Sequence, residues 1–314
     1  MWWAMLPRSP PSSSSSLFRW AMCNSGCSGT IEMTAVVLTP RRTGLTPSYA
    51  IFLILFWLLA GASVYPLFWL FLNSLKSSAE MFGGAWALPE EWRWSNYTAA
   101  WDAGISQYLV SSIIVTVAST ILVVFLSSAA AFALVVLKFR GKMLIYAAIL
   151  GGLILPPEVS LFPLFKTLNT LGIYNTYFAL IIPYVAFGIP FTTFLIRSYM
   201  VTIPHELNEA SIMDGAGPVW TFLHVYLPLC RPILASAALI EAMRVWNEFI
   251  FALTFVESES VKTITIGMMS FANALRRDWA VLMAGLAISI IPILATFLVM
   301  QRQFIGGLTQ GAIK

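Results

Sequence analysis

Long apolar runs alternate with short polar connections along this chain. Six of the runs reach the length of about 20 residues that a helix needs to cross about 30 Å of hydrocarbon. They are Tyr49–Leu72, Tyr108–Leu137, Met143–Phe165, Tyr174–Ile196, Pro232–Val256 and Trp279–Met300. The pattern predicts an all-α membrane protein whose six transmembrane helices occupy residues 48–304.

The composition supports a membrane location. Hydrophobic residues make up 59% of the 314 residues, and charged residues make up only 10%. A soluble domain carries about 25% charged residues, so a surface with so few charges could not keep several long apolar runs in solution. The net charge of +4 gives no indication of nucleic-acid binding.

Prolines interrupt several of the predicted spans. They are Pro66, Pro156, Pro157, Pro183, Pro190 and Pro292. A broken helix in a membrane needs neighbouring helices or water to satisfy the freed carbonyl groups. We therefore expect a packed bundle around a path.

The positions of lysine and arginine predict the orientation, because short cytoplasmic loops retain them. The shortest loop contains Lys138, Arg140 and Lys142, which places both termini in the cytoplasm. Residues 1–47 are expected to be an N-terminal extension, disordered or partly untranslated, with Met33 as an alternative start. Residues 305–314 are expected to form a cytoplasmic tail.

Two other patterns have limited weight. The cysteines Cys23, Cys27 and Cys230 provide neither a disulfide framework nor a metal site, and no serine, histidine and acid arrangement indicates hydrolysis. The predicted external loop, residues 73–107, contains Trp86, Trp92, Trp94, Tyr97 and Trp101. These aromatic residues favour a belt at the membrane interface, with sugar stacking as the alternative.

One predicted internal loop, residues 197–231, is long and semi-polar, and its sequence predicts two short helices. Pro204 suits a first helical turn, Gly215 can end that helix in the left-handed conformation, and Gly217 with Pro218 opens the second helix. A stripe at helical spacing contains Leu207, Ala210, Ser211 and Asp214. This face could lie along the membrane or fit a groove on a partner. The adjoining spans exclude a DNA-binding role.

This loop resembles the cytoplasmic signature of the membrane subunits of binding-protein-dependent ABC importers, which is Glu-Ala-Ala, three residues, Gly, nine residues and Ile-x-Leu-Pro. The chain has Glu209, Ala210 and Ser211, then Gly215, and then Val225, Leu227 and Pro228. Both intervals match, and the two departures are conservative.

Further segments resemble the carbohydrate branch of that family, which includes maltose-type and glycerol-phosphate-type importers. They occur in the family's order between about Ser48 and Lys314, and are Phe139–Lys142, Leu171–Thr176, Ile203–Glu206, Trp246–Phe249, Gln301–Phe304 and Gly307–Lys314.

The resemblance implies that the chain is a permease subunit that receives force through a coupling helix docked on a separate ATPase subunit. The residues implied in that contact are Leu207, Glu209, Ala210, Ser211, Asp214 and Gly215. A second contact is implied for Leu308, Gln310 and Lys314 in the tail, with a frayed terminus as the alternative. The implied partners are a second permease, two ATPase subunits, an extracytoplasmic solute-binding protein, a sugar or polyol, and membrane lipid.

The chain is not expected to be an enzyme. Its only Gly-Lys pair, Gly141-Lys142, lacks the preceding glycine of a phosphate-binding loop. ATP and Mg are therefore expected in the partner ATPase, with no cofactor in this chain. The expected location is the inner membrane of a bacterial or archaeal cell.

Several polar residues inside the predicted spans are candidates for the translocation path: Glu158, Glu241, Arg244, Asn247 and Glu248. Glu241, Arg244 and Glu248 are spaced to share one helix face and to pair there. The sequence does not separate substrate contact from a structural ion pair. Glu158 keeps a proton-coupled secondary transporter as an alternative function, although that alternative leaves the signature loop unexplained.

Overall fold

The computed structural model describes the backbone of residues 47–84, 86–274 and 278–312, and the side chains of residues 50–84, 86–273 and 278–301. The predicted N-terminal extension, with its alternative start at Met33, lies outside this part except for Pro47. In the predicted tail, Lys314 lies outside it, and Leu308 and Gln310 belong to a helix whose side chains there are not described.

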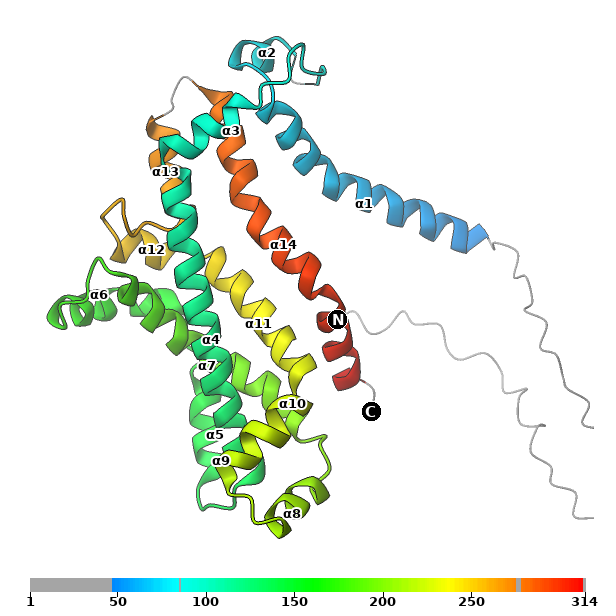
Figure 1. Cartoon of the computed structure of the whole chain (residues 1–314), viewed down its shortest axis with the longest axis vertical. Coiled ribbons are helices and arrows are strands. Elements are labelled where there is room, and N and C mark those ends of the chain that lie inside the picture. Colours follow the sequence, from blue (N-terminus) through cyan, green and yellow to red (C-terminus); the bar gives the residue numbers. More distant parts are fainter. Residues whose placement is uncertain (1–46, 85, 275–277, 313–314) are drawn as a thin grey trace, which may run out of the picture. The chain divides into compact units, whose positions relative to one another are not determined.

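The described residues form helices and turns, with no strand among them (Figure 1). The α-helices are α1 (Pro47–Ser74), α2 (Ser78–Gly83), α3 (Ser95–Ala100), α4 (Ser106–Val136), α5 (Lys142–Gly151), α6 (Leu161–Thr170), α7 (Tyr177–Met200), α8 (Glu206–Met213), α9 (Pro218–Thr221), α10 (Leu227–Leu229), α11 (Arg231–Trp246), α12 (Ile250–Phe255), α13 (Ile264–Ala274) and α14 (Trp279–Ala312). The predicted all-α class is confirmed.

Within the described residues, four helical segments are long and apolar enough to cross a membrane. They are Ala50–Ser74, Ser95–Val136, Tyr177–Met200 and Trp279–Gln301. A fifth crossing results if Pro218–Leu229 and Arg231–Trp246, which meet at 79°, form one broken span. By their length and composition, the described helices therefore do not reproduce the predicted count of six single spanning helices.

Two predicted spans are each broken into two helices. In Met143–Phe165, α5 ends at Gly151 and α6 begins at Leu161, because Pro156 and Pro157 have no N–H to continue a helix. In Pro232–Val256, α11 ends at Trp246 and α12 begins at Ile250. Each predicted span therefore contains two shorter helices.

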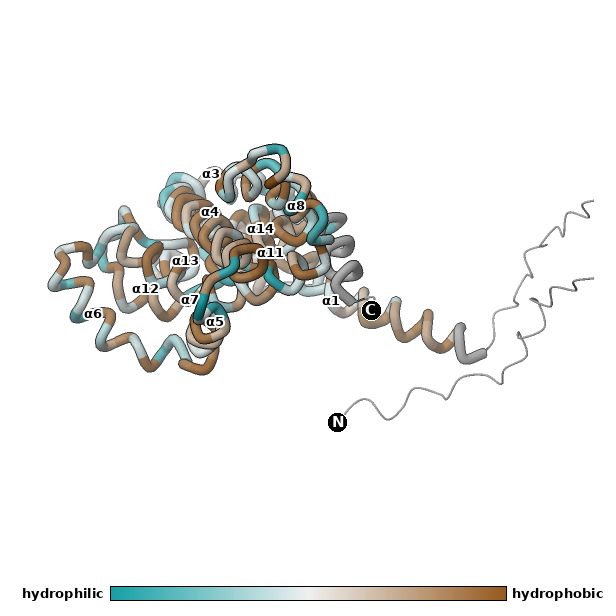
Figure 2. The backbone as a smooth tube through the Cα atoms, turned by 90° about the horizontal axis from the view of Figure 1, so that it is seen from below, coloured by the Kyte–Doolittle hydropathy of each residue, from teal (hydrophilic) through white to brown (hydrophobic). Residues whose placement is uncertain are grey.

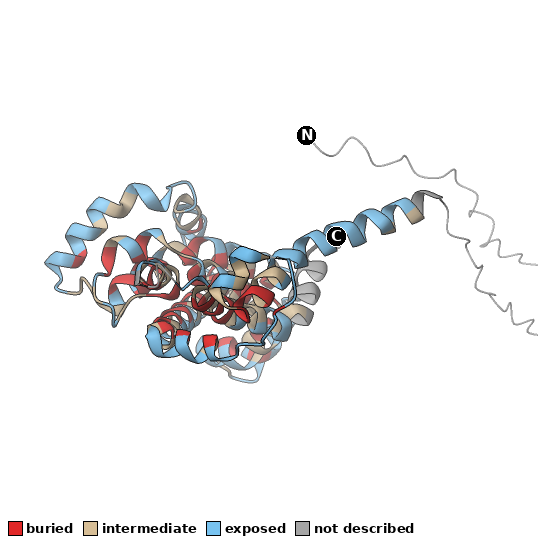
Figure 3. Cartoon of the chain, turned by 90° about the horizontal axis from the view of Figure 1, so that it is seen from above, coloured by how far each residue is buried: buried red, intermediate tan, exposed pale blue. Residues whose placement is uncertain are grey.

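The centre of the unit formed by residues 56–314 is the packing of α4 against α7 and α11. Small buried residues line this contact, including Ser127, Ser128 and Gly188, and the Ser127 hydroxyl lies 3.4 Å from the carbonyl oxygen of Ile189. Small side chains let membrane helices approach closely. Figure 3 shows the buried residues concentrated in these packed helices.

The first helix, α1, has a different surface. Within its predicted span, none of the most apolar 18-residue window is buried, and Trp57 and Phe68 are 69% and 61% exposed. Figure 2 shows apolar residues along its length. A helix that is apolar all round suits lipid or a partner membrane helix.

Candidate functional site

The signature loop folds as two helical segments, as its sequence predicts. The first, α8, follows Pro204 and His205, and its C-terminal end is closed by Gly215 at φ +78°. The N–H groups of Gly215 and Ala216 donate to the carbonyl oxygens of Ile212 and Ser211, each over 2.9 Å. Gly215 is favoured at this left-handed position because a Cβ there adds strain.

The second segment begins where predicted, with Gly217 as its extended N-cap and Pro218 in the first turn. It continues as a π-helical turn, Phe222–Tyr226, into α10. The rings of Phe222 and Tyr226 pack against Phe132 of α4, with centroids 5.3 and 5.1 Å apart. These buried aromatic residues attach the loop firmly to the membrane helices.

The predicted stripe on α8 is divided between two environments. Ser211 is buried, and its hydroxyl lies 3.1 Å from that of Thr221 on α9. Leu207 is 41% exposed, and Ala210 and Asp214 are exposed, as is the neighbouring Glu209. Ser211 therefore holds α8 on α9, while the other predicted residues are accessible.

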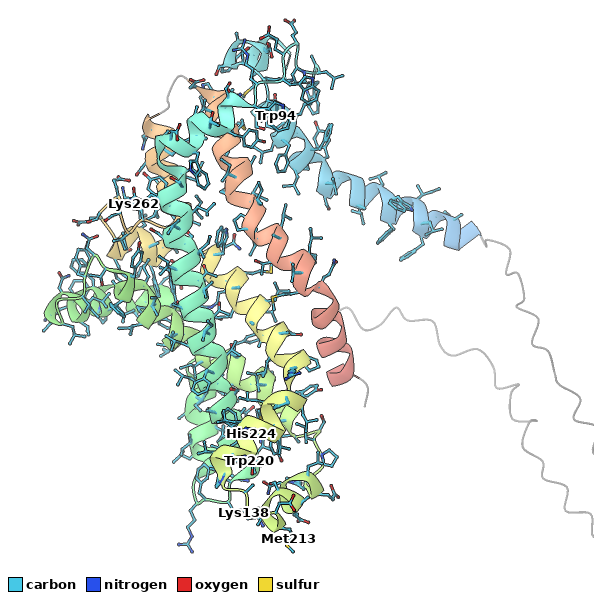
Figure 4. The ribbon with its side chains drawn as sticks, in the orientation of Figure 1. Trp94, Lys138, Met213, Trp220, His224 and Lys262 are labelled. Carbon is cyan, nitrogen blue, oxygen red and sulfur yellow. The ribbon has the colours of Figure 1, made fainter. Side chains whose placement is uncertain are left out.

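The most exposed apolar side chain of α8 is one that the stripe omits. Met213 is 87% exposed and Ile212 is 60% exposed, while Val219 and Trp220 of α9 are 71% and 50% exposed. Figure 4 shows Met213, Trp220, His224 and Lys138 near one another at the lower end of the view. The sequence feature that could have indicated this exposed apolar surface is the pair Ile212-Met213, which lies shortly before the turn at Gly215.

A cavity of about 710 Å³ lies between the α4–α5 connection and α8. Its lining includes Lys138, Lys142, His205 and Glu209. The basic cluster that predicts a cytoplasmic loop and the signature helix thus lie on the same side of the chain.

Two of the predicted intramembrane charges form an ion pair. The Arg244 guanidinium donates through Nε to Glu241 Oε2 over 3.0 Å, and its Nη2 also contacts Glu241 Oε1. Nη2 also donates to the carbonyl oxygen of Tyr184 on α7 over 2.6 Å. Glu241 is only 2% exposed, so this pair belongs to the contact between α11 and α7.

Glu248 does not join that pair, because α11 ends at Trp246, before Glu248. Its carboxylate accepts the N–H groups of Phe251 and Ala252 over 2.8 and 3.2 Å, at the start of α12. The Tyr184 hydroxyl donates to the same carboxylate over 2.5 Å. Tyr184 therefore links the ion pair to Glu248, and the prediction that all three charges pair on one face is wrong for Glu248.

The remaining candidates for the path lie elsewhere. Asn247 is exposed and lines a cavity of about 360 Å³ with Thr265 and Ser289. Glu158 is exposed in a 3₁₀ turn, Pro157–Ser160, and its carboxylate has no hydrogen bond or ion pair to another described residue. The described residues include no group of three or more His, Cys, Asp or Glu that could hold a metal ion.

The loop that follows α12 is fixed by hydrogen bonds to Asn175 and to Tyr108. Asn175, at φ +57°, accepts through Oδ1 the N–H groups of Glu257 and Ser258, each over 2.9 Å. Glu259 accepts from Lys262 Nζ and from the Tyr108 hydroxyl, each over 2.6 Å. The hydrogen bond from Lys262, then that from Tyr108, lowers the pKa of Glu259 below its ordinary value, against the opposing effect of burial.

The described residues form an all-helical fold with several helices long and apolar enough to cross a membrane, and an exposed helical loop packs against them through buried aromatic side chains. The family model described as "Binding-protein-dependent transport system inner membrane component" matches residues 124–305, and the chain belongs to this family. It is thus an inner-membrane permease subunit of an ABC importer, a transport component and not an enzyme.

Individual relatives agree with the family. The "Probable ABC transporter permease protein YurM" of Bacillus subtilis (strain 168) is 43% identical over 88% of this chain and 91% of its own length. The "Diacetylchitobiose uptake system permease protein NgcG" of Streptomyces coelicolor is 35% identical over 80% of this chain and 84% of its own length. A chain from a bacterial ABC transporter involved in alginate import matches with a TM-score of 0.72 and 25% identity over 82% of this chain and 98% of its own.

These findings confirm the predicted resemblance, function class and membrane location. They disfavour the alternative of a proton-coupled secondary transporter, for which Glu158 was the main reason. The residues predicted to dock on an ATPase or to line the path are not tested by the relatives and stay predictions.

Proposed function

We propose that this chain forms half of the translocation path of an importer for an oligosaccharide or a related polyol. The relatives support this substrate class through their printed names, which include diacetylchitobiose, melibiose with raffinose and stachyose, and trehalose with maltose. The proposed assembly adds a second permease, two ATPase subunits and an extracytoplasmic solute-binding protein. The family description names dependence on a binding protein.

In the proposed topology the chain crosses the membrane six times and both termini are cytoplasmic. The crossings are α1, α4, the broken pair α5 and α6, α7, the broken pair α11 and α12, and α14. The cavity shared by Lys138, Lys142 and α8 supports this arrangement, because basic residues concentrate in short cytoplasmic loops.

The observation that best supports force transfer from a partner to the membrane helices is the way in which α8 is attached to them. Its inner side is fixed by the Ser211–Thr221 contact, and the following π-helical turn packs on Phe132. Its outer side exposes Ile212 and Met213. Short helices with exposed apolar side chains fit grooves on partner proteins. Because these contacts hold α8 rigidly, movement of such a partner would be passed on to the membrane helices. The helix α4 packs against the π-helical turn, and α11 follows α10 directly.

ATP and Mg would bind in the ATPase subunits. Leu207, Glu209, Ala210, Asp214 and Gly215 would lie in or beside the docking contact, and Ser211 would support it from beneath. The tail residues Leu308, Gln310 and Lys314 would make a second contact with the ATPase pair. Sugar would pass near Asn247, whereas Glu241, Arg244 and Glu248 would hold the helices that surround the path.

Replacement of Gly215 tests the proposal. Gly215→Glu places a bulky acid at φ +78°, where it strains the end of α8. We expect normal insertion but strongly reduced uptake for each ATP hydrolysed. Gly215→Asn is the matched control, because asparagine tolerates the left-handed conformation better than most residues.

Uptake of radiolabelled oligosaccharide and ATP hydrolysis would be measured together in proteoliposomes that contain the whole transporter. Coupling in Gly215→Asn should lie between those of the wild type and Gly215→Glu. Normal coupling in Gly215→Glu would refute the role of this turn. Uptake that persists without ATP would refute the proposed energy source.

A further inference from the structure

The cavity between α8 and the α4–α5 connection contains charged groups that no contact within the described chain explains. Its volume of about 710 Å³ lies within the range of about 300–1,000 Å³ that is usual for ligand sites. Its lining includes Lys138, Lys142, His205 and Glu209. None of these four side chains makes a hydrogen bond or a salt bridge to another described residue. Their polar groups are therefore available to a ligand.

The cavity borders one side of α8. The lining residues on that side follow the i, i+3, i+4, i+7 spacing of a single helix face and are His205, Asn208, Glu209 and Ile212. Met213, the most exposed apolar side chain of α8, is not among the lining residues. The Ser211 hydroxyl contacts Thr221 of α9. A partner that docks at Met213 therefore approaches α8 from a different side.

The opposite wall of the cavity lies at the end of a membrane span. Val135, Val136 and Leu137 line it, and they are the last two residues of α4 and its C-cap. The apolar helical segment Ser95–Val136 ends at the same point. In the proposed topology this point is the cytoplasmic border of the bilayer, where the polar headgroups of the lipids lie.

Two exposed lysines stand at this border. Lys138 follows the C-cap of α4, and Lys142 is the first residue of α5. A lysine at the end of a span lays its methylene groups along apolar surface and places its ammonium group at the level of the headgroups. Basic pockets between membrane helices on the cytoplasmic side bind anionic headgroups. Two lysines against the one carboxylate of Glu209 give the cavity the sign of charge that such a headgroup needs.

The apolar part of the lining favours a lipid over a soluble anion. Free phosphate would use the lysines but would gain nothing from Val136, Ile212 and Pro218, which line the same cavity. A phospholipid presents its phosphate to the lysines and its glycerol and first methylene groups to the apolar side chains, whose removal from water is favourable. The mixed lining therefore fits an amphipathic ligand.

We infer that this cavity binds the headgroup of an anionic phospholipid. Lys138 and Lys142 donate hydrogen bonds to its phosphate, and the Asn208 amide donates to the polar group beyond the phosphate. The bound lipid connects the end of α4 to α8. The inference uses the proposed topology and goes beyond the proposed transport function, because it adds a lipid ligand beside the signature helix.

Titration of the complete, delipidated transporter with phosphatidylglycerol, followed by native mass spectrometry, tests the site. Lys138→Gln together with Lys142→Gln should raise the Kd of the most tightly bound lipid roughly 30-fold, the effect of removing two basic groups near an anionic headgroup. Arg93→Gln with Lys166→Gln is the matched control, because it removes two exposed basic groups outside the cavity lining. The same Kd in all three proteins would overturn the inference.

Removal of the acid should act in the opposite direction. Glu209→Gln takes a negative charge out of the cavity lining and should lower the Kd for phosphatidylglycerol by roughly fivefold. Glu206→Gln is its control on the same helix, since Glu206 is also exposed but does not line the cavity. An unchanged or higher Kd in Glu209→Gln would contradict a phosphate bound in this cavity.

Competition separates a lipid from a soluble anion and from a neutral lipid. Millimolar inorganic phosphate should not displace the bound phosphatidylglycerol, and phosphatidylcholine should bind more weakly. Displacement by phosphate would overturn the lipid as the occupant, and equally tight phosphatidylcholine would overturn the role of the lysines. Binding is measured without ATP or sugar, so a negative result leaves the proposed transport function standing, and a failure of transport would not alter these affinities.

Discussion

Glu241 of α11 lies against the bare Cα of Gly188 on α7. A Cβ at position 188 would be 2.5 Å from Glu241 Oε1 and 2.9 Å from Val123 Cγ2. The absence of a side chain at Gly188 thus makes room for a buried carboxylate, and Arg244 neutralises that carboxylate from the same helix. Substitution at either helix should disturb the other.

Gly188→Ala should destabilise the protein by about 1–3 kcal/mol, the usual cost of overpacking. Gly61→Ala is the control, because a Cβ at Gly61 has no neighbour within 4 Å. Thermal unfolding of the transporter in detergent would compare the two. Equal melting temperatures would contradict the close packing of Glu241 on Gly188.

Removal of one partner of the buried pair should cost more than removal of both. Glu241→Leu leaves Arg244 without its carboxylate, and because the Arg244 side chain is 36% exposed, the expected loss is smaller than the about 3–5 kcal/mol of a fully buried pair. The double variant Glu241→Leu with Arg244→Leu should recover part of that loss. The same melting experiment checks the order, and a double variant less stable than Glu241→Leu would indicate that Arg244 has a further role.

The two sides of α8 should respond differently to substitution. Met213→Glu places a charge on the exposed side, so it should reduce the coupling of ATP hydrolysis to uptake without changing the amount of chain in the membrane. Ser211→Ala removes the contact with Thr221 and should lower stability by about 1 kcal/mol. Limited proteolysis of the 197–231 loop would detect the second effect. Normal coupling in Met213→Glu would exclude Met213 from the contact.

Asn175 should be replaceable by aspartate but not by alanine. Asn175→Ala removes the acceptor of two N–H groups. It also puts alanine, which has no polar side chain to bond locally, at φ +57°. We expect the free energy of unfolding to fall by about 1–3 kcal/mol. Asn175→Asp retains an acceptor oxygen and tolerates this conformation. Melting temperatures distinguish the variants, and an unchanged melting temperature for Asn175→Ala would contradict the role of Asn175 as an acceptor.

Stability should depend on pH through Glu259. Its pKa is lower in the folded protein than in the unfolded chain, because Lys262 and Tyr108 donate hydrogen bonds to the carboxylate. The resulting stabilisation is fully present above the unfolded pKa of about 4.3 and is lost as pH falls through the lower folded pKa. Melting temperatures between pH 7 and acid pH should therefore fall less steeply in Glu259→Gln. Lys262→Met should have a similar effect, and parallel curves for all three proteins would contradict the prediction.

The sequence by itself determined the class of fold and the signature helix. Long apolar runs require a membrane because water cannot accommodate them, and Gly215, Gly217 and Pro218 act through local backbone preferences that do not depend on distant residues. For the same reason the turn at Gly215 and the start of α9 are where the sequence predicts them.

Only the tertiary structure decided which neighbours the polar residues have. Helical spacing placed Glu248 with Glu241 and Arg244, but the end of α11 at Trp246 moves Glu248 to the start of α12. Spacing also placed Ser211 on the accessible stripe of α8, whereas contact with Thr221 buries it. The partner of a side chain depends on how separate helices pack, and periodicity within one helix contains no information about that packing.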